Sequence, residues 1–201
     1  MEKSLKFIHI TKTGGTSIED CAIKKDVRFG RFQVKYYTPD KRGAQHHTFF
    51  HYIPESIQTK FDWFAVVRNP YNRILSEYHC KWGGGYDYGI KNNSDNKCAI
   101  KMNQYIQTAI INRISKGGHY SEQYKYFDKP SNVKIHILKF ENLKDEFNGL
   151  MQQYNMDINL NIHHNKTTKR FSVSDFSKQT IEMINTIYEP DFRLFGYDMI
   201  K

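Results

Sequence analysis

The sequence has few cysteines, and no two of them have the spacing of a paired metal-binding or redox motif. Cys21, Cys80 and Cys98 lie far apart, without the C-x-x-C spacing of a zinc or redox site. Free thiols in a reducing compartment are therefore expected. The nine histidines include adjacent pairs but not the i, i+4 spacing of a helical zinc site. The sequence predicts no metal.

Long hydrophobic runs are also absent. The longest uninterrupted apolar stretch, Trp63 to Val67, is far shorter than the roughly 20 residues that a membrane-spanning helix needs. The N-terminal residues MEKSLKFIHI lack the apolar segment of a secretory signal. We therefore expect a soluble, cytoplasmic protein with no membrane span, signal peptide or anchor.

Acidic residues are too few to balance the basic ones. Against 30 Lys and Arg there are 21 Asp and Glu, which gives a net charge of +9, and such an excess favours an anionic partner. No helix-turn-helix or aromatic RNA-binding segment is recognisable, so no specific nucleic-acid binding is predicted. The 201 residues, 39% of them hydrophobic, suit one domain over 1–201. Nothing in the sequence specifies an oligomeric state.

Hydrophobic periodicity predicts strands that alternate with helices. Such alternation is typical of an α/β fold with a central, mainly parallel sheet flanked by helices. Further helices are expected at 98–114 and 175–188. The predicted strand-to-helix units run from 5–10 into 17–25, from 62–67 into 71–82, and from 133–138 into a helix that ends near 154.

The turn after the first predicted strand has the composition of an anion site. Lys12 precedes Gly14 and Gly15 where a helix begins. Glycines let the backbone wrap a phosphate, and a helix N-terminus supplies N–H groups and partial positive charge. The order of residues differs from G-x-x-x-x-G-K-[ST], in which the lysine follows the glycines. An ordinary strand-to-helix turn is the alternative interpretation.

A second set of polar residues follows the second predicted strand. Arg68 ends that strand, and Arg73 and Ser76 lie on the next predicted helix. Ligands of open α/β sheets bind at the carboxyl ends of the strands. The two sets of residues together predict a ligand with two separated phosphates, unless the arginines are only surface or structural charges.

These segments together resemble a known family. The stretch FIHITKTGGTS (7–17) resembles the 5′-phosphosulfate loop of sulfotransferases that use 3′-phosphoadenosine 5′-phosphosulfate (PAPS). The stretch VVRNPYNRILSEY (66–78) resembles their 3′-phosphate segment, and YEPDFRLFGY (188–197) is similar to the end of the carbohydrate-acting branch, which includes heparan-sulfate 2-O-sulfotransferases. The resemblance implies a P-loop-like sulfotransferase fold, PAPS as sulfuryl donor and adenosine 3′,5′-bisphosphate as product.

The resemblance also implies roles for individual residues. Lys12 would stabilise charge on the leaving phosphate, and Arg68 with Ser76 would hold the 3′-phosphate. The residues implied for the 5′-phosphate are Thr13, Gly14, Gly15, Thr16 and Ser17. A basic loop implied to cover the nucleotide is Lys166, Thr167, Thr168, Lys169 and Arg170, for which a merely solvated loop is the alternative.

Sulfuryl transfer to a hydroxyl also requires a base. The segment QHHTFF (45–50) resembles the family segment that carries a catalytic histidine, and the threonine two places on favours His46 over His47. A surface or capping histidine is the alternative for either residue. No metal is required in this mechanism.

The acceptor is less well defined by the sequence. The resemblance and the basic charge favour a glycan hydroxyl, with an acidic saccharide as a suitable partner. Candidate walls for a sugar ring are the glycine-rich loop 82–97 and the aromatic segment 119–127, which contains Tyr124 and Tyr126, although a place in the core is the alternative for such tyrosines. The Golgi members of the family have an anchor and lumenal disulfides, and neither is found here. Alternatives are an inactive PAPS- or nucleotide-binding module and a small ATP-dependent phosphate-loop kinase, although no G-K-[ST] sequence is present.

Overall fold

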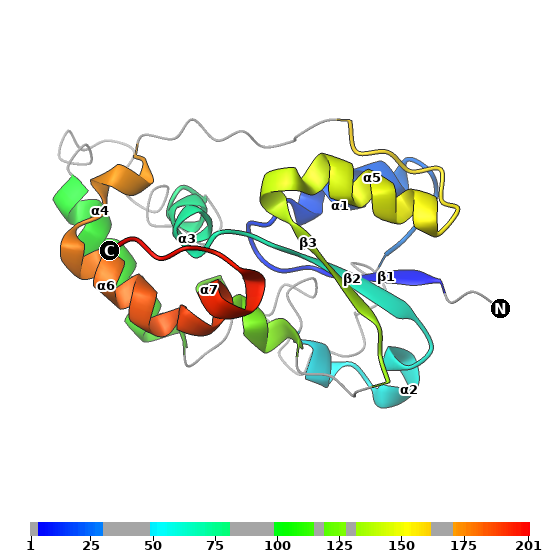
Figure 1. Ribbon diagram of the computed structural model, residues 1–201, viewed down its shortest axis with the longest axis horizontal. Coiled ribbons are helices and arrows are strands. Elements are labelled where there is room, and N and C mark those ends of the chain that lie inside the picture. The colour runs from blue at the N-terminus through cyan, green and yellow to red at the C-terminus, as the bar shows by residue number, and fades with distance from the viewer. Residues whose placement is uncertain (1–3, 30–48, 81–98, 115–118, 128–131, 162–170) are drawn as a thin grey trace. The chain divides into compact units, whose positions relative to one another are not determined.

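The computed structural model describes residues 4–29, 49–80, 99–114, 119–127, 132–161 and 171–201. The chain divides into two compact units, each made from separate stretches of sequence. The first unit contains residues 1–68 and 125–164, and the second contains residues 69–124 and 165–201. Figure 1 shows the helices and strands of both units.

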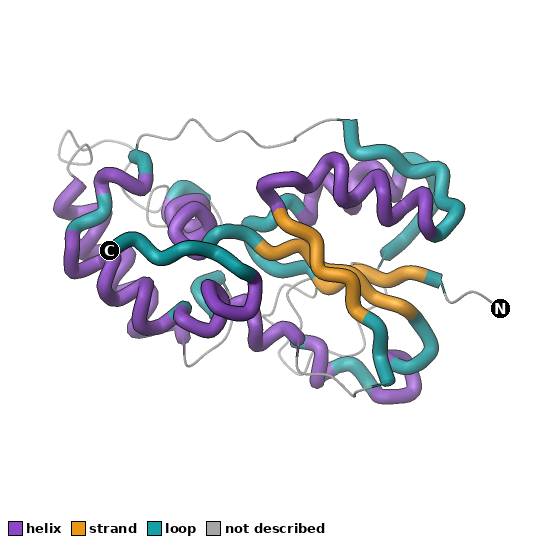
Figure 2. The backbone as a smooth tube through the Cα atoms, in the orientation of Figure 1, coloured by secondary structure: helices purple, strands orange, loops and turns teal. Residues whose placement is uncertain are grey.

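The first unit contains a parallel sheet. Its strands lie in the order β1-β2-β3, and both neighbouring pairs are parallel, with Ile8 of β1 beside Ala65 of β2 and Val67 of β2 beside Lys139 of β3. Figure 2 shows the strands crossing one another with the twist expected of parallel sheets. The predicted α/β class with a parallel sheet is confirmed. The strands are β1 (Leu5–Ile8), β2 (Asp62–Val67) and β3 (Ile135–Lys139).

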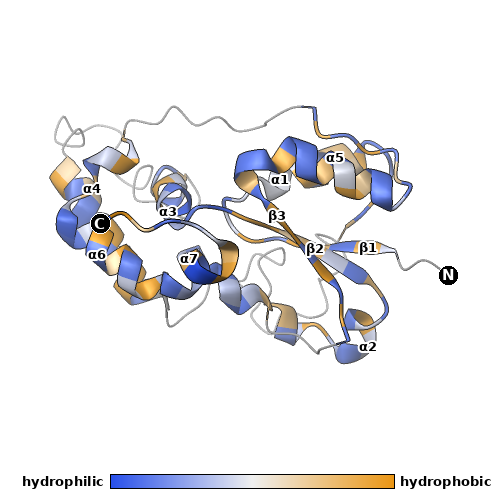
Figure 3. Ribbon diagram, in the orientation of Figure 1, coloured by the Kyte–Doolittle hydropathy of each residue, from blue (hydrophilic) through white to orange (hydrophobic). Residues whose placement is uncertain are grey.

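Two helices cover one face of this sheet. Helix α1 (Gly15–Ile23) follows β1, and α5 (Leu143–Gln153) follows β3 through the 3-10 turn η6 (Phe140–Asn142). The apolar residues of α5 recur at the spacing of one helical face, and both helices show hydrophilic and hydrophobic patches in Figure 3. This core contains Leu5, Phe7, Ile18, Ala22, Phe64, Val66, Phe147, Leu150 and Met151.

The other face of the sheet is covered by η3 (Phe50–Tyr52) and the short helix α2 (Glu55–Gln58). The ring of Phe50 packs edge-on against Trp63, with centroids 5.1 Å apart. The indole Nε1 of Trp63 donates to the carbonyl oxygen of Gln58 at 2.9 Å. Because β2 is covered on both faces, its residues from Trp63 to Val67 are all buried.

The second unit is helical in its described residues. Its core is formed by apolar faces of α3, α4, α6 and α7, and α4 packs against α6. Asn69 caps α3 by accepting hydrogen bonds from the Tyr71 and Asn72 backbone N–H groups, and Ser177 caps α6. The helices are α3 (Pro70–Tyr78), α4 (Ala99–Ile114), α6 (Lys178–Ile187) and α7 (Glu189–Phe195), with the 3-10 turns η5 (Gln123–Phe127), which extends into the first unit, and η7 (Val173–Asp175).

The structure changes several predicted helix ends. The helix predicted over 175–188 begins only at Lys178, because Ser177 has an extended backbone and caps it. A new helix, α7, begins at Glu189 with Pro190 in its first turn, where a missing N–H group is tolerated. The helix predicted over 71–82 ends at Tyr78, and the ring of the next residue, His79, bonds the Leu75 carbonyl oxygen.

Candidate functional site

The loop between β1 and α1 reverses the chain with unusual backbone angles. Lys12 has a φ of +59° and Gly14 a φ of +87°, in the left-handed region that favours glycine. The Thr13 hydroxyl donates to the carbonyl oxygen of Ile10 at 2.9 Å and thus holds the turn closed. For a lysine, a left-handed backbone is an uncommon conformation of the kind found at functional sites.

The two glycines of this loop each lie against a side chain. A Cβ atom added to Gly14 would be 2.8 Å from Leu143 Cδ2 and 3.2 Å from Phe140 Cε2. A Cβ atom added to Gly15 would overlap the imidazole ring of His9. Both positions therefore need glycine for close approach, whatever ligand the loop binds.

A buried contact between a histidine and a glutamate fixes the base of the loop. His9 Nδ1 lies 3.0 Å from Glu19 Oε1, and both side chains are almost fully buried. His9 directly follows β1, and Glu19 is on α1. The pair therefore connects the strand to the helix on either side of the glycine turn.

The N-terminus of α1 presents backbone N–H groups without a competing side chain. Its N-cap is Gly14, no side chain caps the helix, and the first turn contains no acidic residue. Such an end carries partial positive charge and binds anions. Thr16 is exposed and Ser17 is buried in this turn, so the predicted 5′-phosphate residues, Thr13 to Ser17, form one continuous turn.

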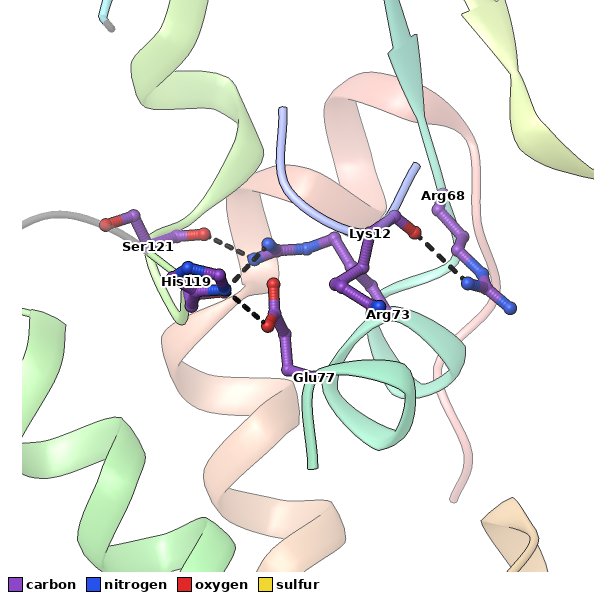
Figure 4. A network of polar contacts seen from close by, with 6 residues as sticks. All are labelled: Lys12, Arg68, Arg73, Glu77, His119 and Ser121. Atoms are coloured by element: carbon purple, nitrogen blue, oxygen red, sulfur yellow. Dashed lines mark hydrogen bonds and ion pairs between the residues drawn. The ribbon is translucent and has the colours of Figure 1, made fainter. Parts of the chain in front are cut away.

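Arg68 joins this loop from the end of β2. Its Nη1 donates to the carbonyl oxygen of Lys12 at 3.1 Å, and its guanidinium stacks on Phe140, 4.1 Å from the ring centroid (Figure 4). Phe140 directly follows β3. The structure therefore brings the predicted Lys12 and Arg68 together at the carboxyl edge of the sheet, with an aromatic support that the sequence analysis missed.

The ammonium group of Lys12 has no hydrogen bond or ion pair within the described part of the chain. Its carbonyl oxygen is bonded to Arg68, whereas its side chain is half-buried. A lysine held by its backbone, with its ammonium available, can neutralise an anion bound at the loop. Lys12, the α1 N-terminus and Arg68 are the described groups of the first unit that suit a phosphate-bearing cofactor.

Other predicted site residues have different outcomes. Ser76 lies on α3, in the second unit, and is buried, so its grouping with Arg68 stays a prediction. His46 and His47 lie in 30–48, and Lys166 to Arg170 lie in 162–170, both outside the described residues. Their roles as base and nucleotide cover also stay predictions.

Arg73 is a structural residue of the second unit. Its side chain is fully buried, and its guanidinium donates to the backbone carbonyl oxygens of His119, at 3.2 Å, and of Ser121 (Figure 4). Both bonds connect α3 to residues 119–121. The expectation that Arg73 contributes its charge to a phosphate site is therefore wrong, because its guanidinium donates to backbone carbonyl oxygens within the core.

A buried carboxylate organises another part of this unit. Asp191 Oδ2 accepts from the backbone N–H of Gln123 and Oδ1 from that of Tyr124, each at 2.8 Å. Burial raises the pKa of Asp191, against the opposing effects of Arg73 and these hydrogen bonds. Burial also raises the pKa of Tyr188, whose hydroxyl donates to the Tyr120 carbonyl oxygen at 2.5 Å.

The suggested aromatic wall for an acceptor is only partly compatible with the structure. Tyr126 is fully buried, with its ring centroid 4.6 Å from that of Phe49, so it cannot stack on a sugar and that expectation is wrong. Tyr124 is half-buried, and the loop 82–97 lies outside the described residues. The contact of Phe140 with Arg68 joins elements distant in sequence, although an aromatic residue at a strand end is a usable signal for Phe140. The contact of His9 with Glu19 joins consecutive elements, ten residues apart, and depends on how the two side chains pack.

Comparison with known proteins gives one match. The model of the sulfotransferase family matches residues 2–198, almost the whole chain. The search of curated proteins and the search of solved structures found no match. Among the helices of the described residues, none combines the length and apolar character needed to cross a membrane.

Proposed function

The chain belongs to the sulfotransferase family, and on this premise we propose that it transfers a sulfuryl group from PAPS to a hydroxyl group. The favoured acceptor is a hydroxyl group of a carbohydrate. The family match extends over both units, which supports a single sulfotransferase domain over 1–201. The contact between Arg68 Nη1 and the Lys12 carbonyl oxygen, 3.1 Å, is the observation that carries the proposal, because it joins the two predicted phosphate segments.

The described residues fit the anionic end of this donor. The uncapped N-terminus of α1 would receive the 5′-phosphate through backbone N–H groups. The Lys12 ammonium would lie beside the oxygen that bridges phosphorus and sulfur, and the Arg68 guanidinium would pair with the 3′-phosphate. Ser76 and the basic residues from Lys166 to Arg170 would complete the nucleotide site. PAPS supplies an activated sulfuryl group whose phosphate is a good leaving group.

The proposed reaction requires one proton transfer and the exchange of one sulfur–oxygen bond for another. His46, with His47 as the alternative, would accept the proton of the acceptor hydroxyl. The acceptor oxygen then forms a bond to sulfur as the bond from sulfur to the bridging oxygen breaks, and the electron pair stays on the 5′-phosphate. Lys12 would stabilise that negative charge. The products are a sulfate ester and adenosine 3′,5′-bisphosphate.

The acceptor class follows from charge and resemblance. A net charge of +9 favours an acidic saccharide through long-range attraction. Binding without transfer would indicate the inactive-module alternative, and preference for magnesium-ATP would indicate the kinase alternative.

Calorimetric titration tests the cofactor class. Wild-type protein should bind adenosine 3′,5′-bisphosphate more tightly than 5′-AMP or magnesium-ATP. Lys12→Ala should weaken that binding at least about tenfold, since a charge-assisted hydrogen bond contributes roughly 1.5–3 kcal/mol. Lys24→Ala, an exposed lysine just after α1, is the matched control and should bind as wild type. Equal binding of the bisphosphate and 5′-AMP would overturn the proposal.

A transfer assay tests the base and the acceptor. PAPS is supplied with acidic and neutral oligosaccharides, and sulfated product is measured. His46→Ala should abolish transfer while leaving bisphosphate binding intact. If His47→Ala alone has that effect, the base is His47; if neither has it, a histidine base in this segment is excluded.

A further inference from the structure

Three side chains with metal-binding donor atoms meet in the second unit, at the end of α3. Glu77 is in the last turn of α3, Cys80 follows it by three residues, and His119 precedes η5. A carboxylate oxygen, a thiol sulfur and an imidazole nitrogen from these residues lie within 4.8 Å of one another. Because all three belong to residues 69–124, the cluster is contained in one compact unit.

The donors are already close to the separations that coordination requires. Ligand bonds of about 2.0–2.3 Å in tetrahedral geometry put donor atoms about 3.3–3.8 Å apart. His119 Nδ1 lies 2.8 Å from Glu77 Oε2, and the ligand atoms of the three residues all lie within 4.8 Å of one another. Shifts of about 1 Å, within reach of side-chain rotation, would bring all three to one ion.

Glu77 provides an independent indication of a ligand. Its side chain is fully buried, and while Oε2 contacts His119, Oε1 has no hydrogen-bond partner among the described residues. A buried carboxylate oxygen without a partner is costly, and a bound ion is one of the few explanations for such an atom. The second oxygen therefore offers a ligand position that no donor in the described part of the chain occupies.

The surrounding contacts hold the donors in place. Arg73, one turn before Glu77 on α3, donates to the backbone carbonyl oxygens of His119 and Ser121 (Figure 4). These bonds fix the His119 backbone opposite α3. The Glu77 carboxylate and a Cys80 thiolate would together balance the charge of a divalent ion beside the Arg73 guanidinium.

We propose that Glu77, Cys80 and His119 bind one divalent transition-metal ion, with zinc favoured by the donor chemistry. Thiolate and imidazole ligands suit zinc and disfavour magnesium and calcium, which prefer oxygen donors. Cys80 loses its proton on binding, as a coordinating thiol does. Three protein ligands leave a fourth position for water, and entry is from the side of His119, whose side chain is 25% exposed whereas Glu77 is covered. The site shares no residue with the nucleotide site proposed above.

Metal titration of the reduced full-length protein tests this proposal. After treatment with a chelator and its removal, Zn²⁺ binding is measured by equilibrium dialysis with elemental analysis, and Co²⁺ binding by absorption. We expect one ion per chain and a thiolate-to-cobalt charge-transfer band. Cys80→Ser should remove the band and lower Zn²⁺ affinity at least about tenfold, a loss that even outer-shell changes at metal sites produce.

Matched controls separate the cluster from nonspecific binding. Cys21→Ser changes the half-buried free thiol of the first unit and should retain both the band and the affinity. His119→Gln should lose affinity, whereas His51→Gln should not. Far-ultraviolet circular dichroism of the metal-free variants checks folding, and His119→Gln serves as the test variant if Cys80→Ser does not fold. Absence of stoichiometric binding in the wild type, or wild-type affinity in a folded Cys80→Ser or His119→Gln variant, overturns the site.

Discussion

The Arg68 guanidinium donates a hydrogen bond to the Lys12 carbonyl oxygen at 3.1 Å and so joins the residue after β2 to the loop that follows β1, the neighbouring parallel strand. The same guanidinium stacks on Phe140 from the end of the third strand. The Arg68 side chain therefore makes a stacking contact with a ring and a directional hydrogen bond at the same time. The ammonium group of a lysine cannot make both.

Replacing Arg68 by lysine should weaken nucleotide binding although it keeps the charge. We expect Arg68→Lys to lower affinity for adenosine 3′,5′-bisphosphate at least about tenfold, or ~1.4 kcal/mol, as measured by calorimetry. Arg193→Lys is the control, because that arginine is exposed on α7 and forms an ion pair with Glu189 four residues before it. Wild-type affinity in Arg68→Lys would show that charge alone suffices.

The aromatic support under Arg68 is a separate prediction. Phe140→Leu keeps an apolar side chain beside Gly14 but removes the ring face, and a partly desolvated cation–π contact contributes about 0.5–2 kcal/mol. Bisphosphate affinity should fall about two- to thirtyfold. Phe61→Leu removes a ring that lies under the Lys6 ammonium, 5.1 Å from the centroid, and should leave binding unchanged. Equal losses in both variants would contradict a specific role for Phe140.

Two glycine substitutions should have opposite effects on stability. Gly15→Ala places a methyl group in the ring of His9, and we expect the free energy of unfolding to fall by about 1–3 kcal/mol, as overpacking does. Gly149→Ala lies on α5, where a Cβ atom meets nothing within 4 Å. That change should raise the free energy of unfolding by about 0.5–1 kcal/mol, because alanine favours helix. Urea unfolding measures both, and a neutral Gly15→Ala would show that the loop moves away from His9 without cost.

The buried Asp191 carboxyl should make stability depend on pH. Burial raises its pKa in the folded protein, so between its unfolded and folded pKa values the native state holds a proton that the unfolded state has lost. The contribution of this group therefore favours folding below the unfolded value, about 3.9, and declines as pH rises through the raised folded value. Asp191→Asn should remove that decline from the pH profile of unfolding free energy.

Asp191→Asn should also lower the free energy of unfolding at every pH. An amide NH2 group replaces one of the two accepting oxygens and cannot accept a hydrogen bond, so the backbone N–H group of either Gln123 or Tyr124 loses its acceptor. The free energy of unfolding should therefore fall by about 1–3 kcal/mol. Asp198→Asn makes the same chemical change at an exposed position and should alter neither the stability nor the profile. An Asp191→Asn profile parallel to that of the wild type would contradict the raised pKa.

Local patterns in the sequence predict the sheet well, because they reflect local chemistry. The predicted strand 62–67 coincides with β2, since a continuous apolar run there ends just before an arginine and a proline. The ends of helices are predicted less accurately, because capping residues determine them. The Ser177 cap makes α6 begin at Lys178, and Pro190 lies in the first turn of a separate helix, α7.

The site was predictable where a motif carries it and not where packing does. Lys12, Gly14 and Arg68 follow from their places at strand ends. The support of Arg68 by Phe140, and the His9–Glu19 pair, require knowing which elements meet. The Glu77–His119 contact joins residues 42 positions apart, and a search limited to short metal-binding spacings cannot find it.

The interleaving of the two units has a consequence for protein synthesis. The chain passes between them three times, after residues 68, 124 and 164, so neither can be expressed as one continuous fragment. On the ribosome, β2 emerges long before β3, its partner along one edge. Until residue 139 has been translated, the nascent chain presents an apolar strand with an open hydrogen-bonding edge. During that interval β2 is open to pairing with other chains, the route to aggregation against which chaperones protect nascent proteins.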